Sequence, residues 1–92
     1  GVPRCLLEAM ALKKPIVTTD HVGCREAVED GINGFLVPVR DGNAVAEKIE
    51  ILIKDPGLRK KMGHAGFEKA ILEFDESIIV DQLLKKLYHF NI

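Results

Sequence analysis

The feature that most constrains the fold is a short run of β-branched residues, PIVTT at residues 15–19, which directly follows a helical run. Such a run is typical of a strand buried on both faces of a sheet. A second short apolar run, GFLVP at residues 34–38, is entered through an Asn-Gly turn signal. Strands that alternate with helices indicate a parallel sheet, which needs both faces covered and usually more than two strands. The sequence therefore predicts the last part of a doubly wound α/β domain, separated from its earlier strands.

Two helices are expected in the β/α part of the chain, residues 1–40. The first opens at Pro3, where the missing N–H costs nothing, and ends at Lys13-Lys14, ahead of Pro15. The second is short and is predicted over residues 25–29, between a loop at residues 20–23 and the turn at Asp30-Gly31. The two strands should be adjacent and parallel, with helices on the sheet.

Three helices are expected in the helical part, residues 41–92. Asp41 should cap a long amphipathic helix that Asp55-Pro56-Gly57 ends, and residues 58–72 should form the next one. The last helix should start at Asp75 or Ser77. The apolar face predicted for the long helix consists of Val45, Ile49, Leu52 and Ile53. That of the last helix consists of Ile78, Ile79, Leu83, Leu84, Leu87 and Tyr88.

Composition excludes several classes of function. The chain has 92 residues, enough for one small domain, and its 13 Lys+Arg against 14 Asp+Glu give a net charge of -1, so no nucleic-acid partner is expected. The apolar runs are too short to span a membrane, and no signal peptide is recognisable. The two cysteines form neither a disulfide framework nor a metal-ligand cluster. These observations predict a soluble, cytoplasmic protein with reduced thiols.

Taken together, several segments carry a family resemblance. GVPRCLLEAMALKKPIVTTDHVGCREAVEDGINGFLVPVRD resembles the C-terminal donor-binding region of family 4 retaining glycosyltransferases, which have the GT-B fold. Those enzymes carry a Glu-x7-Glu motif, in which Gly1 to Leu7 would be the spacer and Glu8 the second glutamate. The first glutamate would stand directly before Gly1. DPGLRKKMGHAG and EFDESIIVDQLLKKLY are similar to later family segments, so the resemblance covers essentially the whole chain.

The resemblance implies a site for a nucleotide-sugar donor at the start of the first helix. A helix N-terminus offers backbone N–H groups and partial positive charge to a diphosphate, here through the amides of Arg4, Cys5 and Leu6. Glu8 would accept hydrogen bonds from the ribose hydroxyls, which explains a carboxylate in an apolar run. Spacing alone fits another interpretation, an exposed Glu8 that pairs with Arg4 at i,i+4. Further candidate contacts to the donor are Val2, Pro3 and Glu26.

The remaining polar residues are expected to have ordinary roles. His21 lies in the loop after the first strand and is expected to be solvated, and Glu26 is equally well explained as a first-turn helix residue. Cys5 is expected to be a small packing residue rather than a nucleophile. Residues 59–61 are three consecutive cations for which a solvated face is the default and contact with acidic lipid head groups the alternative.

Two functions from different classes follow. The first is a glycosyltransferase that moves a hexose from a nucleoside diphosphate to an acceptor with retention of configuration. The resemblance then implies that this chain holds no catalytic residue, needs no metal or cofactor, and relies on a missing N-terminal domain to bind a glycan, lipid or small-molecule acceptor. It is further expected to self-associate as a fragment and to act in the cytoplasm or at the inner membrane face. The second is a non-catalytic α/β regulatory or interaction module; a glutamate directly before Gly1 would decide for the first.

Overall fold

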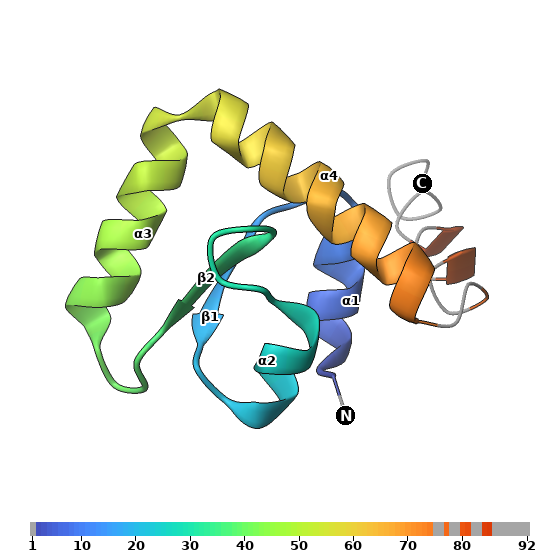
Figure 1. The fold of residues 1–92 in the computed structure, drawn as a ribbon, viewed down its shortest axis with the longest axis horizontal. Helices are drawn as coiled ribbons and strands as arrows, with labels where there is room; N and C mark the ends of the chain where they lie inside the picture. The colour runs from blue at the N-terminus through green and yellow to red at the C-terminus, as the bar shows by residue number, and fades with distance from the viewer. Residues whose placement is uncertain (1, 75–76, 78–79, 82–83, 86–92) are drawn as a thin grey trace.

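The computed structural model of the chain describes residues 2–74, 77, 80–81 and 84–85. Most of the last predicted helix, including Ile78, Ile79, Leu83, Leu87 and Tyr88, lies outside the described residues. The described elements alternate between helix and strand before two consecutive helices (Figure 1). In chain order they are α1 (Arg4–Ala11), β1 (Ile16–Thr19), α2 (Val22–Ala27), β2 (Gly34–Val37), α3 (Gly42–Lys54) and α4 (Pro56–Glu73).

The two strands are adjacent and parallel, as predicted, with Ile16 opposite Gly34 and Thr19 opposite Val37. Side chains alternate between the two faces of the sheet. Ile16 belongs to the core that α1 and α2 contribute to, and Leu36 packs against that core. On the other face, the Lys48 ammonium group of α3 lies 5.0 Å from the centre of the Phe35 ring. Helices therefore cover both faces of the sheet.

The core forms where α1 meets the sheet, α2 and α4. The helical spacing of α1 places Leu6, Met10 and Ala11 in the interior. Ile16, Cys24, Ala27, Val28 and Ala70 complete this cluster from the other elements. Two glycines permit the close approach of backbones. A Cβ atom on Gly34 would collide with the Ile16 carbonyl, and one on Gly63 would collide with the carbonyl of Lys13, two residues after the end of α1.

A single residue, Asp55, connects α3 to α4. Its side chain accepts a hydrogen bond from the Leu58 amide at 2.9 Å, and Pro56 occupies the first turn of α4, where proline is favoured. The Arg59 guanidinium group donates to the carbonyls of Leu52 and Ile53 at the end of α3, at 2.5 and 2.9 Å. These contacts satisfy a backbone N–H at the start of α4 and two backbone carbonyls at the end of α3. For this reason α4 starts at Pro56 and not at the predicted residue 58.

The prediction of a helix over residues 25–29 is wrong at both ends, since α2 spans Val22–Ala27. It starts early because His21 is extended and its carbonyl accepts from the Cys24 and Arg25 amides. It stops early because of Asn33, which is 1% exposed. The side-chain NH2 group of Asn33 donates to the backbone carbonyl of Ala27 at 2.9 Å. Its side-chain oxygen accepts from the backbone N–H of Glu29 at 2.7 Å. These two bonds replace the hydrogen bonds that a further helical turn would have made.

The apolar face predicted for the long helix is only partly buried. Asp41 caps α3 as expected, accepting from the Ala44 amide at 3.0 Å. Leu52 is buried, whereas Ile49 and Ile53 are 43% and 68% exposed. None of the helices in the described part of the chain is long and apolar enough to cross a membrane.

Candidate functional site

Three helices, α1, α2 and α3, begin at the same edge of the sheet. Because β1 and β2 are parallel, their carboxyl ends meet at the same edge, and the start of α1 and the loops that lead into α2 and α3 lie on that side (Figure 1). Open α/β sheets bind ligands at the carboxyl edge of their strands. The candidate site is therefore this carboxyl edge, at the start of α1.

The start of α1 is suited to an anion. Pro3 occupies the N-cap position, no side chain caps the helix, and its first turn contains no acidic residue. The Leu6 and Leu7 amides donate to the Pro3 carbonyl at 3.1 and 3.4 Å. Of the three amides proposed to hold a diphosphate, that of Leu6 is thus engaged within the helix. Arg4 and Cys5 are exposed at the very start of α1, where the partial positive charge of the helix is strongest.

Glu8 is half-buried in the second turn of α1. Helical spacing places it on the side of α1 opposite Leu6 and Met10, which are buried, and on the same side as Arg4. The structure therefore brings Arg4, Cys5 and Glu8 to the outer side of one short helix. Val2 is half-buried and packs against the core instead, and Pro3 is exposed.

Glu26 does not share this arrangement. It lies in the last turn of α2, so its expected place in the first turn of a helix is wrong. Its side chain is exposed. The six-residue α2 starts three residues before the predicted position, which moves Glu26 to the far end of the helix from the carboxyl edge.

The loop between β1 and α2 is held by three contacts at the carboxyl edge. The Asp20 carboxylate accepts from the Arg25 guanidinium group at 2.6 Å, and the Asp20 amide donates to the Val37 carbonyl at 2.7 Å. Across the loop, the Thr18 hydroxyl of β1 donates to the Cys24 thiol of α2 at 3.4 Å. His21, expected to be solvated, is exposed at the N-cap of α2. These contacts hold the loop between β1 and α2 in place beside the carboxyl edge.

Both cysteines are free thiols, as expected, but the location of Cys5 differs from expectation. Cys5, predicted to be a packing residue, is exposed, and Cys24 is the buried thiol. Cys5 falls on the outer side of α1 because it follows the helix start by one residue, ahead of the buried Leu6. Within the described ranges, no group of three or more His, Cys, Asp or Glu side chains is placed to hold a metal ion.

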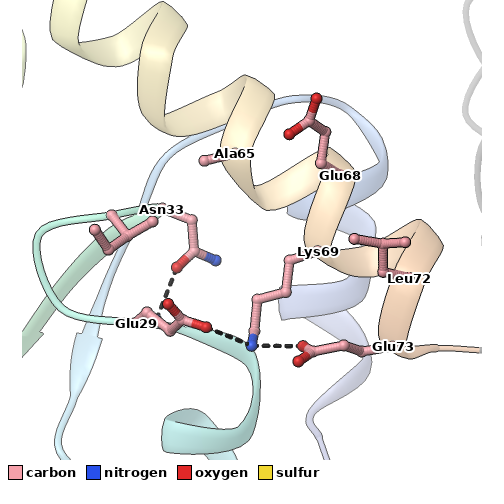
Figure 2. A pocket seen from close by; sticks show the side chains of 8 residues that line it. Glu29, Asn33, Ala65, Glu68, Lys69, Leu72 and Glu73 are labelled. Atoms are coloured by element: carbon pink, nitrogen blue, oxygen red, sulfur yellow. Dashed lines mark hydrogen bonds and ion pairs between the residues drawn. The ribbon is translucent and has the colours of Figure 1, made fainter.

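A hollow of about 320 Å³ lies between α4 and the loop from α2 to β2 (Figure 2). Sequence reasoning missed this hollow and the lysine in it. The Lys69 ammonium group contacts Glu73 at 2.5 Å and Glu29 at 3.1 Å, and its side chain is 14% exposed. The exposed side chains of Ile32 and Leu72 also line the hollow. The spacing of Lys69 and Glu73 is visible in the sequence, but Glu29 is 40 residues away.

This hollow serves the fold and not the candidate site. It borders the segment that leads into β2, at the opposite end of the strand from the carboxyl edge. Partial burial alone would lower the pKa of Lys69, but hydrogen bonds and Coulombic attraction from Glu73 and Glu29 outweigh it, so the net pKa is raised. Lys69 thus remains a cation and links α4 to the loop that Asn33 orders.

Comparison with protein families gives one match over most of the chain. Residues 1–69 match the family described as glycosyl transferases group 1. Among curated sequences, the chain is 42% identical over 83 residues to the capsular polysaccharide biosynthesis glycosyltransferase CapM of Staphylococcus aureus. It is 40% identical over 83 residues to the putative glycosyltransferase EpsD of Bacillus subtilis. Each match covers 90% of this chain and 22% of the relative, so the chain spans about a fifth of their length.

Two solved structures share the fold. A sucrose-phosphate synthase from Thermosynechococcus elongatus superposes with a TM-score of 0.76 at 31% identity, covering 92% of this chain and 22% of that one. The Anabaena protein HepE, solved in complex with UDP, superposes with a TM-score of 0.77 at 30% identity, covering 96% of this chain and 24% of that one.

Proposed function

This chain belongs to the glycosyl transferases group 1 family, and on that premise we propose that the protein containing it transfers a hexose from a nucleoside-diphosphate sugar to an acceptor with retention of configuration. The fold is the C-terminal portion of a Rossmann-like GT-B domain, with two parallel strands between covering helices. Family membership favours this activity over a non-catalytic α/β module.

The observation that carries the proposal is the start of α1 at the carboxyl edge. No side chain caps this helix and its first turn is free of acidic residues, so its partial positive charge is not compensated there. A diphosphate is the part of a nucleotide-sugar donor that such a helix end attracts. The solved relative HepE, crystallised with UDP, supports a nucleotide ligand for this fold. We propose that the backbone amides of Arg4 and Cys5 contact the diphosphate.

Glu8 has a separate role in the proposal. It lies one turn beyond the helix start and on the same side of α1 as Arg4. A carboxylate in this place accepts hydrogen bonds from two neighbouring hydroxyl groups, as the ribose of a nucleotide offers. Glu8 would thus fix the nucleoside while the helix end holds the diphosphate.

The rest of the reaction is assigned to the larger part of the protein. The family motif places its first glutamate, proposed to lie against the donor sugar, directly before Gly1. The acceptor, a glycan, lipid or small molecule, would bind mainly to the N-terminal domain. Charge neutralisation of the diphosphate is assigned to α1 and to basic residues upstream, without a metal ion.

The test is the substitution Glu8→Gln in the full-length protein, with donor affinity measured by calorimetry against UDP- and GDP-sugars. A hydrogen bond to a charged group contributes about 1.5–3 kcal/mol, so the donor Kd should rise by about 10- to 150-fold. Glu26→Gln is the matched control, since Glu26 is exposed on the neighbouring helix α2. An unchanged Kd for the Glu8 variant would reject the role of Glu8. Retention is tested by the anomeric configuration of the product, and an inverted anomer would reject it.

A further inference from the structure

The backbone of β2 presents hydrogen-bonding groups on both sides of the strand. On one side it pairs with β1, and the Val37 carbonyl accepts from the Asp20 amide, so the backbone groups of Val37 point toward β1. Backbone groups alternate in direction along a strand. Those of Gly34 and Leu36 therefore point outward, away from β1. This outer edge of β2 is where a strand of another chain would pair.

The chain covers this outer edge itself, just before it enters β2. The Gly31 amide donates to the Gly34 carbonyl at 2.8 Å, and Asp30 forms an isolated parallel bridge with Gly34. The Asp30 carboxylate accepts from the Leu36 amide at 2.9 Å. Gly31 has a φ of 82°, in the left-handed region that favours glycine, which allows the tight reversal at this point. The turn at Asp30 and Gly31 thus occupies an outward carbonyl and an outward amide of β2.

The sequence of β2 explains why such cover is needed. Its four residues, GFLV, are uncharged and three of them are apolar, a composition that favours pairing between copies of a chain. Proteins protect exposed strand edges with charged side chains, prolines and covering loops. All three occur here, since Asp30 is an exposed carboxylate in a covering turn and Pro38 directly follows the strand. The turn therefore opposes pairing at the one edge of β2 that β1 leaves open.

We propose that Asp30 is an edge-protecting residue, which keeps the outer edge of β2 from pairing with a strand of a second copy of the protein. A second copy would have to break the hydrogen bond between Asp30 and the Leu36 amide, and would bring its backbone carbonyls next to a carboxylate. Asp30 belongs to the segment that leads into β2, at the opposite end of the strand from the carboxyl edge. The inference therefore does not depend on the proposed donor.

Amide hydrogen exchange in the complete protein tests the contact with Leu36. The Leu36 amide should be protected equally at all protein concentrations, because its partner lies in the same chain. Asp30→Ala should raise its exchange rate by about tenfold or more in dilute solution. In that variant the protection should return at high concentration, because Leu36 then pairs with a second copy. An unprotected Leu36 amide in the parent protein would overturn the inference, and that result needs no variant.

Light scattering of the complete protein over a concentration series measures the association itself. The mean mass of Asp30→Ala should rise above that of the parent as the concentration increases. Asp30→Asn should match the parent, because the asparagine side-chain oxygen can still accept from the Leu36 amide. Asp41→Ala is the matched control. It also removes a carboxylate that accepts from a backbone amide, that of Ala44 at 3.0 Å, but at the start of α3 and not at a strand edge.

Three results would overturn the inference. They are a mean mass of Asp30→Ala equal to that of the parent at every concentration, an equal rise in Asp30→Asn, and an equal rise in Asp41→Ala. Donor affinity is expected to be the same in Asp30→Asn and in the parent, so failure here is distinguishable from failure of the proposed function.

Discussion

At Gly63, the backbone of α4 lies close to the segment that follows α1. A Cβ atom there would collide with the Lys13 carbonyl, which is backbone and cannot rotate away. We expect Gly63→Ala to lower the free energy of unfolding by about 1–3 kcal/mol, as overpacking does in well-packed cores. Gly42→Ala is the control, since a Cβ at Gly42 has nothing within 4 Å. Chemical denaturation measures both, and equal stability of the two variants would contradict the close approach.

Lys69 makes a contribution to stability that depends on pH. Its folded pKa is raised by the carboxylates of Glu73 and Glu29 against the opposing effect of burial. A group whose pKa is higher in the folded state stabilises the protein fully below the unfolded pKa, and the contribution is lost as the pH rises through the folded pKa. We expect Lys69→Met to be less stable than the parent at neutral pH, with the difference shrinking above the ordinary lysine pKa. Denaturation curves across that range check this, and a difference that grows with pH would contradict it.

At the scale of elements, the junction between α3 and α4 depends on the Asp55 side chain. The carboxylate accepts from the Leu58 amide at 2.9 Å, and such caps contribute about 0.5–2 kcal/mol. Asp55→Ala should lower the free energy of unfolding by about that amount. Asp55→Asn should retain most of it, because asparagine caps equally well. If the Asn variant loses as much stability as the Ala variant, the cap is not the cause.

Elements governed by local signals could be predicted from the sequence. The β-branched run of β1, the Asn-Gly entry to β2 and the Asp41 cap of α3 are all confirmed. The bounds of α2 could not be predicted, because they depend on where the Asn33 side chain lies in the folded protein. Burial along α3 was likewise beyond prediction, since apolar periodicity identifies a face but not what covers it.

The residues of the two sites described above likewise include some whose placement could be predicted from the sequence and some whose placement could not. Arg4 and Glu8 share a side of α1 because helical spacing dictates it, so their placement could be predicted from the sequence. The exposure of Cys5 depends on the first residue of the helix, a boundary that sequence patterns locate poorly. The contact of Lys69 with Glu29 joins residues 40 positions apart and has no local signal.

At the scale of the whole molecule, we expect the 92-residue chain to show no transferase activity alone. Positioning of donor and acceptor supplies about 7–11 kcal/mol in favourable cases, and under the proposed function this chain would provide only one side of a cleft between two domains. Titration with UDP- and GDP-sugars should give weak binding, at about millimolar Kd, with NMR shifts at the amides of Arg4–Glu8. Sugar transfer by the purified chain would contradict the first expectation, and shifts confined to distant residues would contradict the second.

The isolated chain should also self-associate. Among the described residues, β1 pairs only with β2, so its other edge is open, and Ile49 and Ile53 of α3 are exposed. An open strand edge together with exposed apolar side chains invites pairing between copies. Light scattering over a concentration series should show a rising mean mass. A monodisperse monomer at high concentration would contradict the prediction.

The single-residue connection at Asp55 bears on how this part of the protein can change in length during evolution. One added residue would rotate the rest of α4 by about 100° about its axis and advance it by about 1.5 Å. Gly63, Gly66 and Ala70 would then turn away from the interior they pack against, and bulkier side chains would take their place. Insertions and deletions among relatives should therefore be absent at Asp55 and accumulate at residues 38–41, an exposed loop at the end of β2.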